Sequence, residues 1–264
     1  MIPLRLAGLL LLAAALTACA SAPVTGRSQF MLVSEGDAIS ASTQAYTEVL
    51  KKEAGKIDHG SALERRVEEI TGRLVAQAVK FRPETAQWKW EVVVIDEPDT
   101  LNAWAMAGGK MAIYTGIIQK LNLSDDEIAQ IMGHEIAHAL AKHTAERMSV
   151  AVAQQLGLQV ASTFLGTGSL TSQMAMQAAA IATTVGVQLP NSRKQESEAD
   201  RIGLILMAMA GYDPREAVTV WEQMRAANTG PHKAEWLSTH PADTTRIADI
   251  RHWLPEAMRY YRPQ

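Results

Sequence analysis

The chain has 264 residues, 47% of them hydrophobic, which is enough to bury the core of one domain. Its 25 Lys and Arg against 28 Asp and Glu give a mildly acidic balance without a basic stripe, so nucleic acid is not an expected partner. Aromatic residues make up only 5%, which favours a mainly helical protein over a β-sandwich.

The N-terminal residues resemble a bacterial secretion signal. After Arg5, the apolar run Leu6 to Ala18 is too short to cross a bilayer comfortably and is typical of a signal peptide. The run ends in a pattern that resembles a lipobox, in which Cys19, the only cysteine, would carry a lipid. An ordinary signal peptide with an accidental cysteine is the alternative. We expect a lipoprotein signal peptide at 1–18, and likeness to bacterial lipoproteins implies an outer-membrane location facing the periplasm.

One domain is expected to follow this signal. Small residues over 19–30 are typical of a tether, and nothing in 31–264 indicates a repeat or a second domain. Apolar residues at helical spacing predict helices between about 32 and 80. One helix face there consists of Val67, Ile70, Leu74 and Ala78.

A small sheet is expected next. Trp88 to Ile95 has the strongest strand pattern of the chain, because it is rich in β-branched and aromatic residues. Two short runs, 102–107 and 110–114, flank Gly108 and Gly109. This arrangement predicts a β-hairpin.

Ser124 begins the most clearly marked helix. Its side chain can cap the first free N–H groups, and Glu127 has the position that completes a capping box. We expect this helix to run to about Arg147.

The stretch 150–190 is apolar but contains several glutamines, so helices or a movable cover over the domain are expected rather than a membrane span. Later helices are expected at 194–210, 214–227 and 247–254.

The expected helix contains the pattern H-E-x-x-H at 134–138. Residues four apart lie about one helical turn apart, so His134 and His138 project from one face and can bind the same zinc ion. Glu135 lies on the adjacent flank, where it can accept a proton from the attacking water. A chance match or a structural metal site is the alternative, and a zinc hydrolase is favoured.

A catalytic zinc ion needs a third protein ligand. Glu146 lies about 12 Å beyond His138 along the same expected helix and cannot bind the same ion. Ala141 and Thr144 stand where an arrangement with a third nearby histidine needs Gly and His. His143 falls off that spacing, so we expect it at the surface or just outside the ligand set.

Glu196 is the better candidate for the third ligand. It lies near the start of the helix expected at 194–210, and Asp200 follows one turn later on the same face. Glu198 points roughly the other way. Asp200 can accept a hydrogen bond from a ligand histidine and so fix its tautomer. From spacing alone, an ordinary solvated acidic helix start remains the alternative.

These motifs together resemble the zinc metallopeptidase family that includes HtpX, BepA and LoiP and is related to the CAAX prenyl proteases. The resemblance rests on Asn102 to Ala105 with Gly108-Gly109, on Tyr114 to Gly116, on H-E-x-x-H at 134–138, on E-x-x-x-D at 196–200, and on Thr239-His240-Pro241 with Arg246. It implies that Glu196 is the third ligand of one zinc ion per chain. It also implies an α+β, predominantly helical fold over 31–264: a compact gluzincin-type metallopeptidase domain with a small β-sheet flanking the H-E-x-x-H helix. The short chain looks closest to lipoprotein members such as LoiP.

His240 and Arg246 are further candidates for a catalytic role. A histidine before proline in a polar loop is ordinarily just a loop residue, but the resemblance suggests that this loop approaches the metal. Arg246 can either stabilise an oxyanion or brace the loop.

The expected function is a zinc-dependent endopeptidase in which Glu135 moves the proton. The resemblance implies that the substrates are misfolded or unassembled envelope proteins. It also implies that lipidated Cys19 is the contact with the membrane. A latent, chaperone-like assembly factor that binds proteins and cleaves rarely is the alternative.

We expect an extended substrate to add as a strand to the sheet edge formed by Asn102, Ala103, Trp104 and Ala105. These residues are mostly small, so a peptide backbone can approach closely and bond main chain to main chain. The alternative is a purely structural hairpin whose edge is covered by the 150–190 region.

Overall fold

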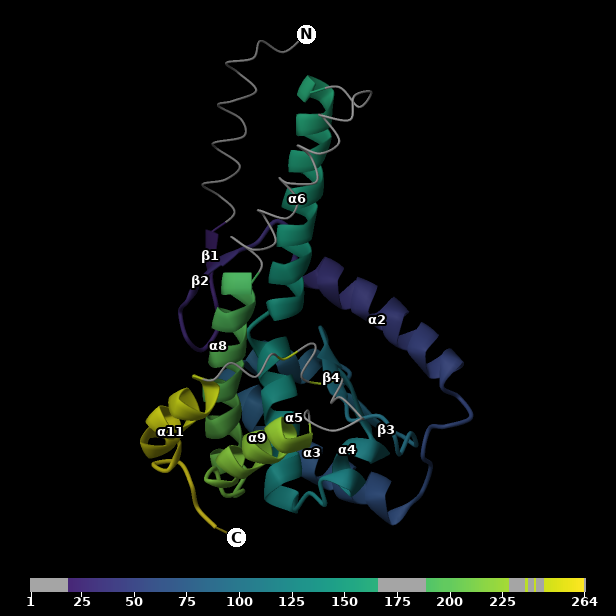
Figure 1. Cartoon of the computed structure of the whole chain (residues 1–264), viewed down its shortest axis with the longest axis vertical. Helices are drawn as coiled ribbons and strands as arrows, with labels where there is room; N and C mark the ends of the chain where they lie inside the picture. The colour runs from purple at the N-terminus through teal and green to yellow at the C-terminus, as the bar shows by residue number, and fades with distance from the viewer. Residues whose placement is uncertain (1–18, 166–188, 228–235, 237–239, 241–244, 264) are drawn as a thin grey trace.

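The computed structural model describes residues 19–165, 189–227, 236, 240 and 245–263. Helix α5 (Asp125–Leu140) runs through the middle of the domain and is packed between α3 (Ala62–Phe81), α8 (Leu189–Met209) and α9 (Glu216–Ala227), with strand β4 on another side (Figure 1). The other helices are α2 (Glu35–Lys52), a 3-10 helix (Pro83–Gln87), α4 (Thr115–Lys120), α6 (His143–Leu165) and α11 (Arg246–Ala257). The predicted class, predominantly helical α+β with a small sheet beside the H-E-x-x-H helix, is confirmed.

The sheet has three strands in the order β3-β5-β4. Strand β3 (Glu91–Ile95) pairs parallel with β5 (Lys110–Tyr114), and β4 (Ala103–Met106) pairs antiparallel with β5. Gly108 and Gly109 form the predicted hairpin turn with φ of 83° and 80°, a backbone region that side chains disfavour. Among the described residues, β4 is therefore an edge strand, as predicted, and α5 and α2 pack against it from outside the sheet.

Two glycines let α5 and α8 cross with their backbones almost touching. A Cβ added at Gly203 would lie 2.9 Å from the backbone nitrogen of His134, and one at Gly133 would lie 3.2 Å from the Gly203 carbonyl oxygen. Both neighbours are backbone atoms that cannot swing aside. This crossing brings the middle of α8, with Glu196 and Asp200, against the H-E-x-x-H turn, because α8 begins at Leu189 and not at the predicted 194.

The helix predicted to run from Ser124 to about Arg147 is broken, so that prediction is wrong at its C-terminal end. The capping box of Ser124 and Glu127 is present, but α5 stops at Leu140 and α6 starts at His143. Lys142 between them has a left-handed φ of 60°. Side chains from elsewhere hold the break: Arg82 donates to the Leu140 carbonyl at 2.8 Å and Gln29 donates to the Ala141 carbonyl at 2.6 Å.

The segment expected as a tether, 19–30, is instead an ordered hairpin. Strand β1 (Cys19–Ser21) pairs antiparallel with β2 (Ser28–Phe30), and Gln29 is buried. The expectation fails because composition does not show that polar side chains of this segment bond to α6 and α8. The signal peptide expected at 1–18 lies outside the described residues.

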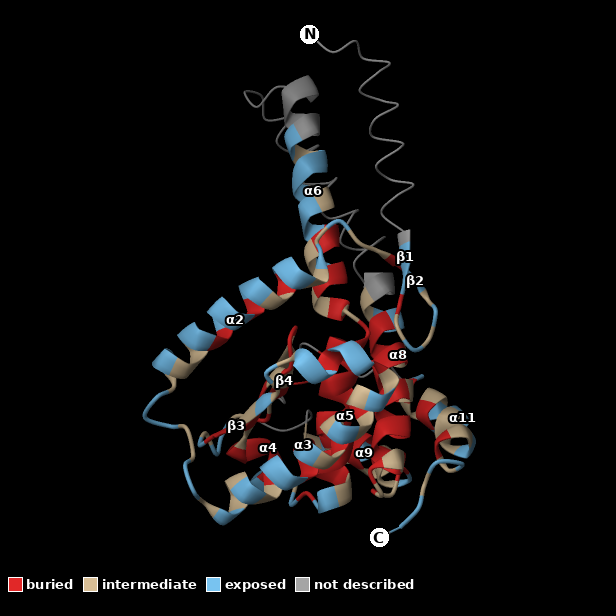
Figure 2. Ribbon diagram, turned by 180° about the vertical axis from the view of Figure 1, so that it is seen from behind, coloured by how far each residue is buried: buried red, intermediate tan, exposed pale blue. Residues whose placement is uncertain are grey.

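Helix α6 projects from the body and is exposed along much of its length (Figure 2). Its outward-facing apolar residues include Val152 and Leu156. In the described part of the chain, no helix combines the length and the apolar character that a membrane span requires. Residues 150–165 of the stretch expected to cover the domain thus belong to this projecting helix, and residues 166–188 lie outside the described part.

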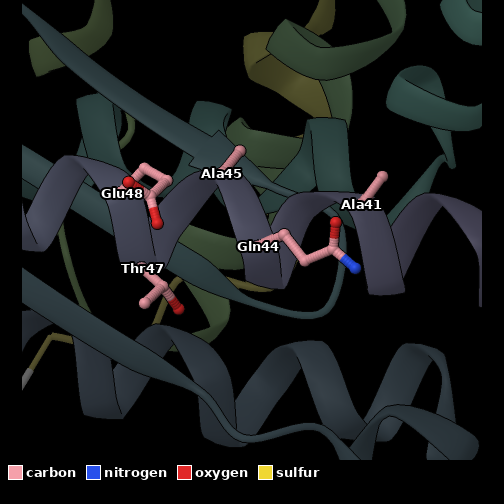
Figure 3. Close-up of a pocket in the computed structure, with 5 residues that line it drawn as sticks. All are labelled: Ala41, Gln44, Ala45, Thr47 and Glu48. Carbon is pink, nitrogen blue, oxygen red and sulfur yellow. The ribbon is translucent and has the colours of Figure 1, made fainter.

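A hollow of about 510 Å³ lies along α2, away from the H-E-x-x-H helix (Figure 3). All the residues that line it come from that one helix: Ala41, Gln44, Ala45, Thr47 and Glu48. Glu48 is the only ionisable residue among them, and it pairs with Lys51. We assign no chemistry to this surface.

Candidate metal centre

Four buried side chains converge on one point between α5 and α8. One ligand atom from each of His134, His138, Glu196 and His240 lies within 4.8 Å of all the others. The two Nε2 atoms of His134 and His138 are 3.1 Å apart, and carboxylate oxygens of Glu196 lie 3.3 and 3.4 Å from them. Imidazole nitrogens with one carboxylate oxygen form a donor set that suits zinc. The residues present therefore fit the metal that the sequence predicts.

Asp200 lies where the sequence places it, behind the first ligand histidine. Its Oδ1 is 2.9 Å from His134 Nδ1. A histidine that binds metal through Nε2 carries its proton on Nδ1, so His134 can donate to Asp200. This bond fixes the ring orientation and leaves Nε2 facing the centre.

Arg246 contacts the acids of α8 from behind. Its Nε and Nη2 donate to Asp200 at 2.6 and 2.7 Å, and Nη1 donates to Glu196 at 3.0 Å. Its guanidinium also lies 3.5 Å from the ring centre of Trp221. Of the two roles predicted for Arg246, these contacts favour bracing, because both carboxylates already engage its donors.

Burial and charge oppose each other at the ligands. Burial lowers the pKa of His134, but hydrogen bonds to Asp200 and Glu196 outweigh it and raise the pKa to about 9. Burial holds the pKa of His138 well below its usual value. Burial alone would raise the pKa of Glu196, but His138, His134 and His240 together bring it well below the usual value. Glu196 is thus an anion ready to bind a cation.

The Glu135 carboxylate lies beside the ligand set and contacts Ala105, Trp236 and His240. Its Oε2 accepts the backbone N–H of Ala105 in β4 at 3.1 Å. Its Oε1 accepts the indole N–H of Trp236 at 2.7 Å and lies 3.4 Å from His240 Nε2. These contacts fix the carboxylate beside the cluster without making it a ligand.

Trp236 is a site residue that the sequence analysis missed. Its ring is buried, stacks on Trp221 at 4.8 Å between centroids, and its backbone N–H donates to the Leu101 carbonyl just before β4. No local motif marks it, because Glu135 and Leu101 lie more than 100 residues away along the chain and Trp221 lies on α9. A lone tryptophan in a polar segment is the only signal that the sequence offers.

His240, predicted as a catalytic residue, lies among the possible ligands. Its Nδ1 is 2.9 Å from Glu196 and 3.2 Å from His134 Nε2. It therefore supplies a fourth donor to a site for which only three were predicted. A catalytic zinc ion keeps one position open, whereas a structural one has four protein ligands.

His143 and Glu198 are both buried, although His143 was expected either at the surface or just outside the ligand set. His143 Nδ1 lies 2.8 Å from His138 Nδ1, and His143 Nε2 lies 3.0 Å from Glu198. The break between α5 and α6 makes this possible, since on a continuous helix residues five apart point in different directions. Glu198 does point away from the ligands, as expected, but into this contact rather than into solvent.

The family model described as Peptidase family M48 matches residues 61–254 of the chain. The chain belongs to Peptidase family M48. The predicted class of enzyme, a metallopeptidase with H-E-x-x-H and E-x-x-x-D motifs, is thereby confirmed at the level of the family. The M48 match includes all four converging side chains and Glu135, but not the N-terminal hairpin.

Several curated relatives of this M48 chain are mitochondrial. The chain is 33% identical to the mitochondrial metalloendopeptidase OMA1 of Saccharomyces cerevisiae over 91% of its own length and 70% of that protein. It is 30% identical to the mitochondrial metalloendopeptidase OMA1 of Homo sapiens, over 90% of its own length and 46% of that protein. It is 30% identical to the beta-barrel assembly-enhancing protease of Escherichia coli over 58% of the chain and 32% of that protein. The chain thus spans less than half the length of the human and bacterial relatives.

These relatives correct the predicted location. An outer-membrane lipoprotein facing the periplasm was expected, but the most similar of the relatives named here are mitochondrial enzymes, and the bacterial protease is matched over a smaller part of the chain. The expected special likeness to short lipoproteins such as LoiP is likewise not what the comparisons show. The prediction was wrong because a short apolar run before a cysteine carries little information about where a protein is located.

Proposed function

We propose that this M48 peptidase is a zinc-dependent endopeptidase with one zinc ion held by His134, His138 and Glu196. The observation that supports it is the convergence of these buried donor atoms within 4.8 Å, with the Glu135 carboxylate beside them. A bound zinc ion would polarise the scissile carbonyl and the attacking water. Glu135 would accept the proton of that water and pass it to the leaving amine.

The contacts of Glu135 suit this proton transfer. The Ala105 N–H and the Trp236 indole N–H both donate to its carboxylate, so it is held as an acceptor in a fixed place. A general base must lie within hydrogen-bonding reach of the proton it takes, and fixed placement lowers the entropic cost of reaching that geometry.

Unfolded protein segments are the substrate class that we propose. Just before β4, the Asn102 carbonyl accepts a bond from Tyr114 of β5, and at the end of β4 the Met106 carbonyl accepts one from Gly109 in the turn. Backbone groups alternate in direction along an antiparallel strand, so those of Ala103 and Ala105 face away from β5. A substrate strand can add at this edge, and only an unfolded segment can offer one.

The fourth donor favours a second proposal, a latent resting state. His240 fills a position that substrate or water would need, and Trp236 of the same segment engages Glu135. The proposed resting enzyme binds proteins and cleaves them rarely until His240 moves away. This keeps the chaperone-like alternative open as a state of the same molecule.

Substitution of the general base tests the function. Glu135→Gln should keep the metal, because Glu135 is not among the converging ligands, but should lower the cleavage rate of unfolded casein by about 10²- to 10⁴-fold. Metal content and casein cleavage would be measured with and without a chelator, with Glu68→Gln on the exposed side of α3 as control. Cleavage at the wild-type rate by zinc-loaded Glu135→Gln would rule out the mechanism.

A further inference from the structure

A buried chain of polar side chains links the proposed metal ligand His138 to the N-terminal hairpin. His138 Nδ1 lies 2.8 Å from His143 Nδ1, and His143 Nε2 lies 3.0 Å from Glu198 Oε2. The same Oε2 accepts the Arg27 Nε at 2.6 Å, and Thr25 donates to the other oxygen of Glu198. His138, His143 and Glu198 are all buried. The motifs H-E-x-x-H, E-x-x-x-D and Thr239-His240-Pro241 specify neither His143 nor Glu198 nor Arg27.

The protons of this chain can be placed from the chemistry of imidazole. A histidine that binds a metal through Nε2 carries its remaining proton on Nδ1. His138 Nδ1 therefore donates, and His143 Nδ1 accepts. A neutral His143 then carries its own proton on Nε2 and donates it to the Glu198 carboxylate. Each of the two hydrogen bonds, from His138 to His143 and from His143 to Glu198, then has one donor and one acceptor.

The two ligand histidines are thus oriented by different partners. His134 donates directly to the carboxylate of Asp200 at 2.9 Å. His138 reaches its carboxylate, Glu198, only through the ring of His143. Partners that orient a metal-binding histidine typically contribute 10- to 100-fold to metal affinity.

Arg27 is the last residue in this series of hydrogen bonds, which begins at His138. Besides Glu198, its two Nη atoms bind Glu146 of α6 at 2.9 and 2.7 Å, and Glu146 also accepts Gln195 of α8 at 2.9 Å. The Arg27 guanidinium therefore bridges Glu146 of α6 and Glu198 of α8, and its bond to Glu198 Oε2 fixes the oxygen that lies 3.0 Å from His143 Nε2.

We propose that His143 and Glu198 are positioning residues for His138, and that the hairpin of residues 19–30 locks them in place through Arg27. The N-terminal hairpin then helps to orient a metal ligand, although it lies outside the residues 61–254 that the family model matches. This inference rests on the proposed zinc site.

Zinc affinity of the purified full chain tests the proposal. Competition with a chromophoric zinc chelator should show binding by His143→Leu about 10- to 100-fold weaker than wild type. His143→Asn should lose less, because its amide oxygen can lie near the place of Nδ1 and accept from His138. Arg27→Ala should also weaken binding, by less than His143→Leu.

The matched control is Arg201→Ala. Arg201 lies on the same helix as Glu198, pairs with Glu256 of α11 at 2.8 Å and is half exposed. It lines the same surface hollow as Arg27 and Glu198, but its hydrogen bonds in the described part of the molecule go to Glu256. It should bind zinc as wild type does. A second readout is the tautomer: in zinc-loaded protein with ¹⁵N-labelled histidine, long-range ¹⁵N–¹H spectra should show His143 protonated on Nε2. A purely structural role for His143 requires neither result.

The outcomes separate this proposal from the zinc site itself. A wild-type chain that binds no zinc would overturn the proposed function. A wild-type chain that binds zinc, with unchanged affinity in His143→Leu, would overturn only the role of His143. If that variant does not fold, unchanged affinity in His143→Asn together with Nδ1 protonation of His143 would do so. Unchanged affinity in Arg27→Ala would overturn the role of the hairpin.

Discussion

The individual side chains at this site act in layers around His134, His138 and Glu196. Asp200 and Arg246 support one flank, and the tightest contacts of Arg246 are to Asp200. Substitution of Arg246 would leave the buried carboxylates of Asp200 and Glu196 without their cation. Arg246 therefore also stabilises the folded protein. Spacing places Asp200 one turn from Glu196 on the same helix face, and in the structure it contacts His134.

His240 gives the prediction that belongs to this scale. His240→Ala should increase casein cleavage by zinc-loaded protein, since it removes the fourth donor and opens the position that substrate needs. The rate of cleavage would be compared at equal zinc occupancy, with His252→Ala on α11, outside the ligand cluster, as control. A drop in cleavage at full occupancy would show instead that His240 takes part in the reaction.

At the scale of elements, the close crossing of α5 and α8 sets the metal geometry. Gly203→Ala should lower the free energy of unfolding by about 1–3 kcal/mol, because the added Cβ would press on the backbone of His134 and Gly133. It should also weaken zinc binding by moving the two helices apart. Chemical denaturation and zinc competition would measure both effects.

Gly72→Ala is the matched control for that crossing. Gly72 lies on α3 with no atom within 4 Å of the added Cβ, and it is exposed. This change should stabilise the domain by about 0.5–1 kcal/mol, as alanine does in a helix interior. Equal stability of Gly203→Ala and wild type would show that the helices can separate without cost.

Strand β4 gives a second prediction at this scale. Ala105→Pro removes the N–H that Glu135 accepts, and this N–H faces away from β5, so the sheet ladder keeps its bonds. We expect a folded protein with a raised KM for unfolded casein, because a proline at this edge hinders pairing with a substrate strand, and with a lowered kcat, because Glu135 loses one of the donors that hold it. Circular dichroism would check the fold. Unchanged KM and kcat in a folded variant would mean that substrate does not pair with this edge.

At the scale of the whole molecule, the metal should connect parts that the chain order separates. Its proposed ligands come from α5 and α8, and His240 lies beyond α9, so binding links three regions at one point. Zinc in 1,000-fold excess over its Kd should stabilise the fold by about 4 kcal/mol and raise Tm by roughly 10 °C. A thermal scan with zinc and with chelator would measure it. Glu196→Ala should show a much smaller shift, and an equal shift would place the ion elsewhere.

The features that the sequence by itself determined all lie within one element or one short motif. Helix periodicity and capping residues marked α3 and the start of α5, and four-residue spacings marked the pairs His134 with His138 and Glu196 with Asp200. These patterns are readable because the α-helix has a fixed geometry.

Only the tertiary structure decided which distant groups meet. The break after Leu140 depends on Arg82 and Gln29 from other elements, and no helix-breaking residue announces it. That break turns His143 back onto His138 and lets the N-terminal hairpin reach Glu198. Trp236 likewise meets Glu135 across 101 residues of chain. Local spacing cannot encode such contacts, because they follow from how the elements pack rather than from the geometry of any one of them.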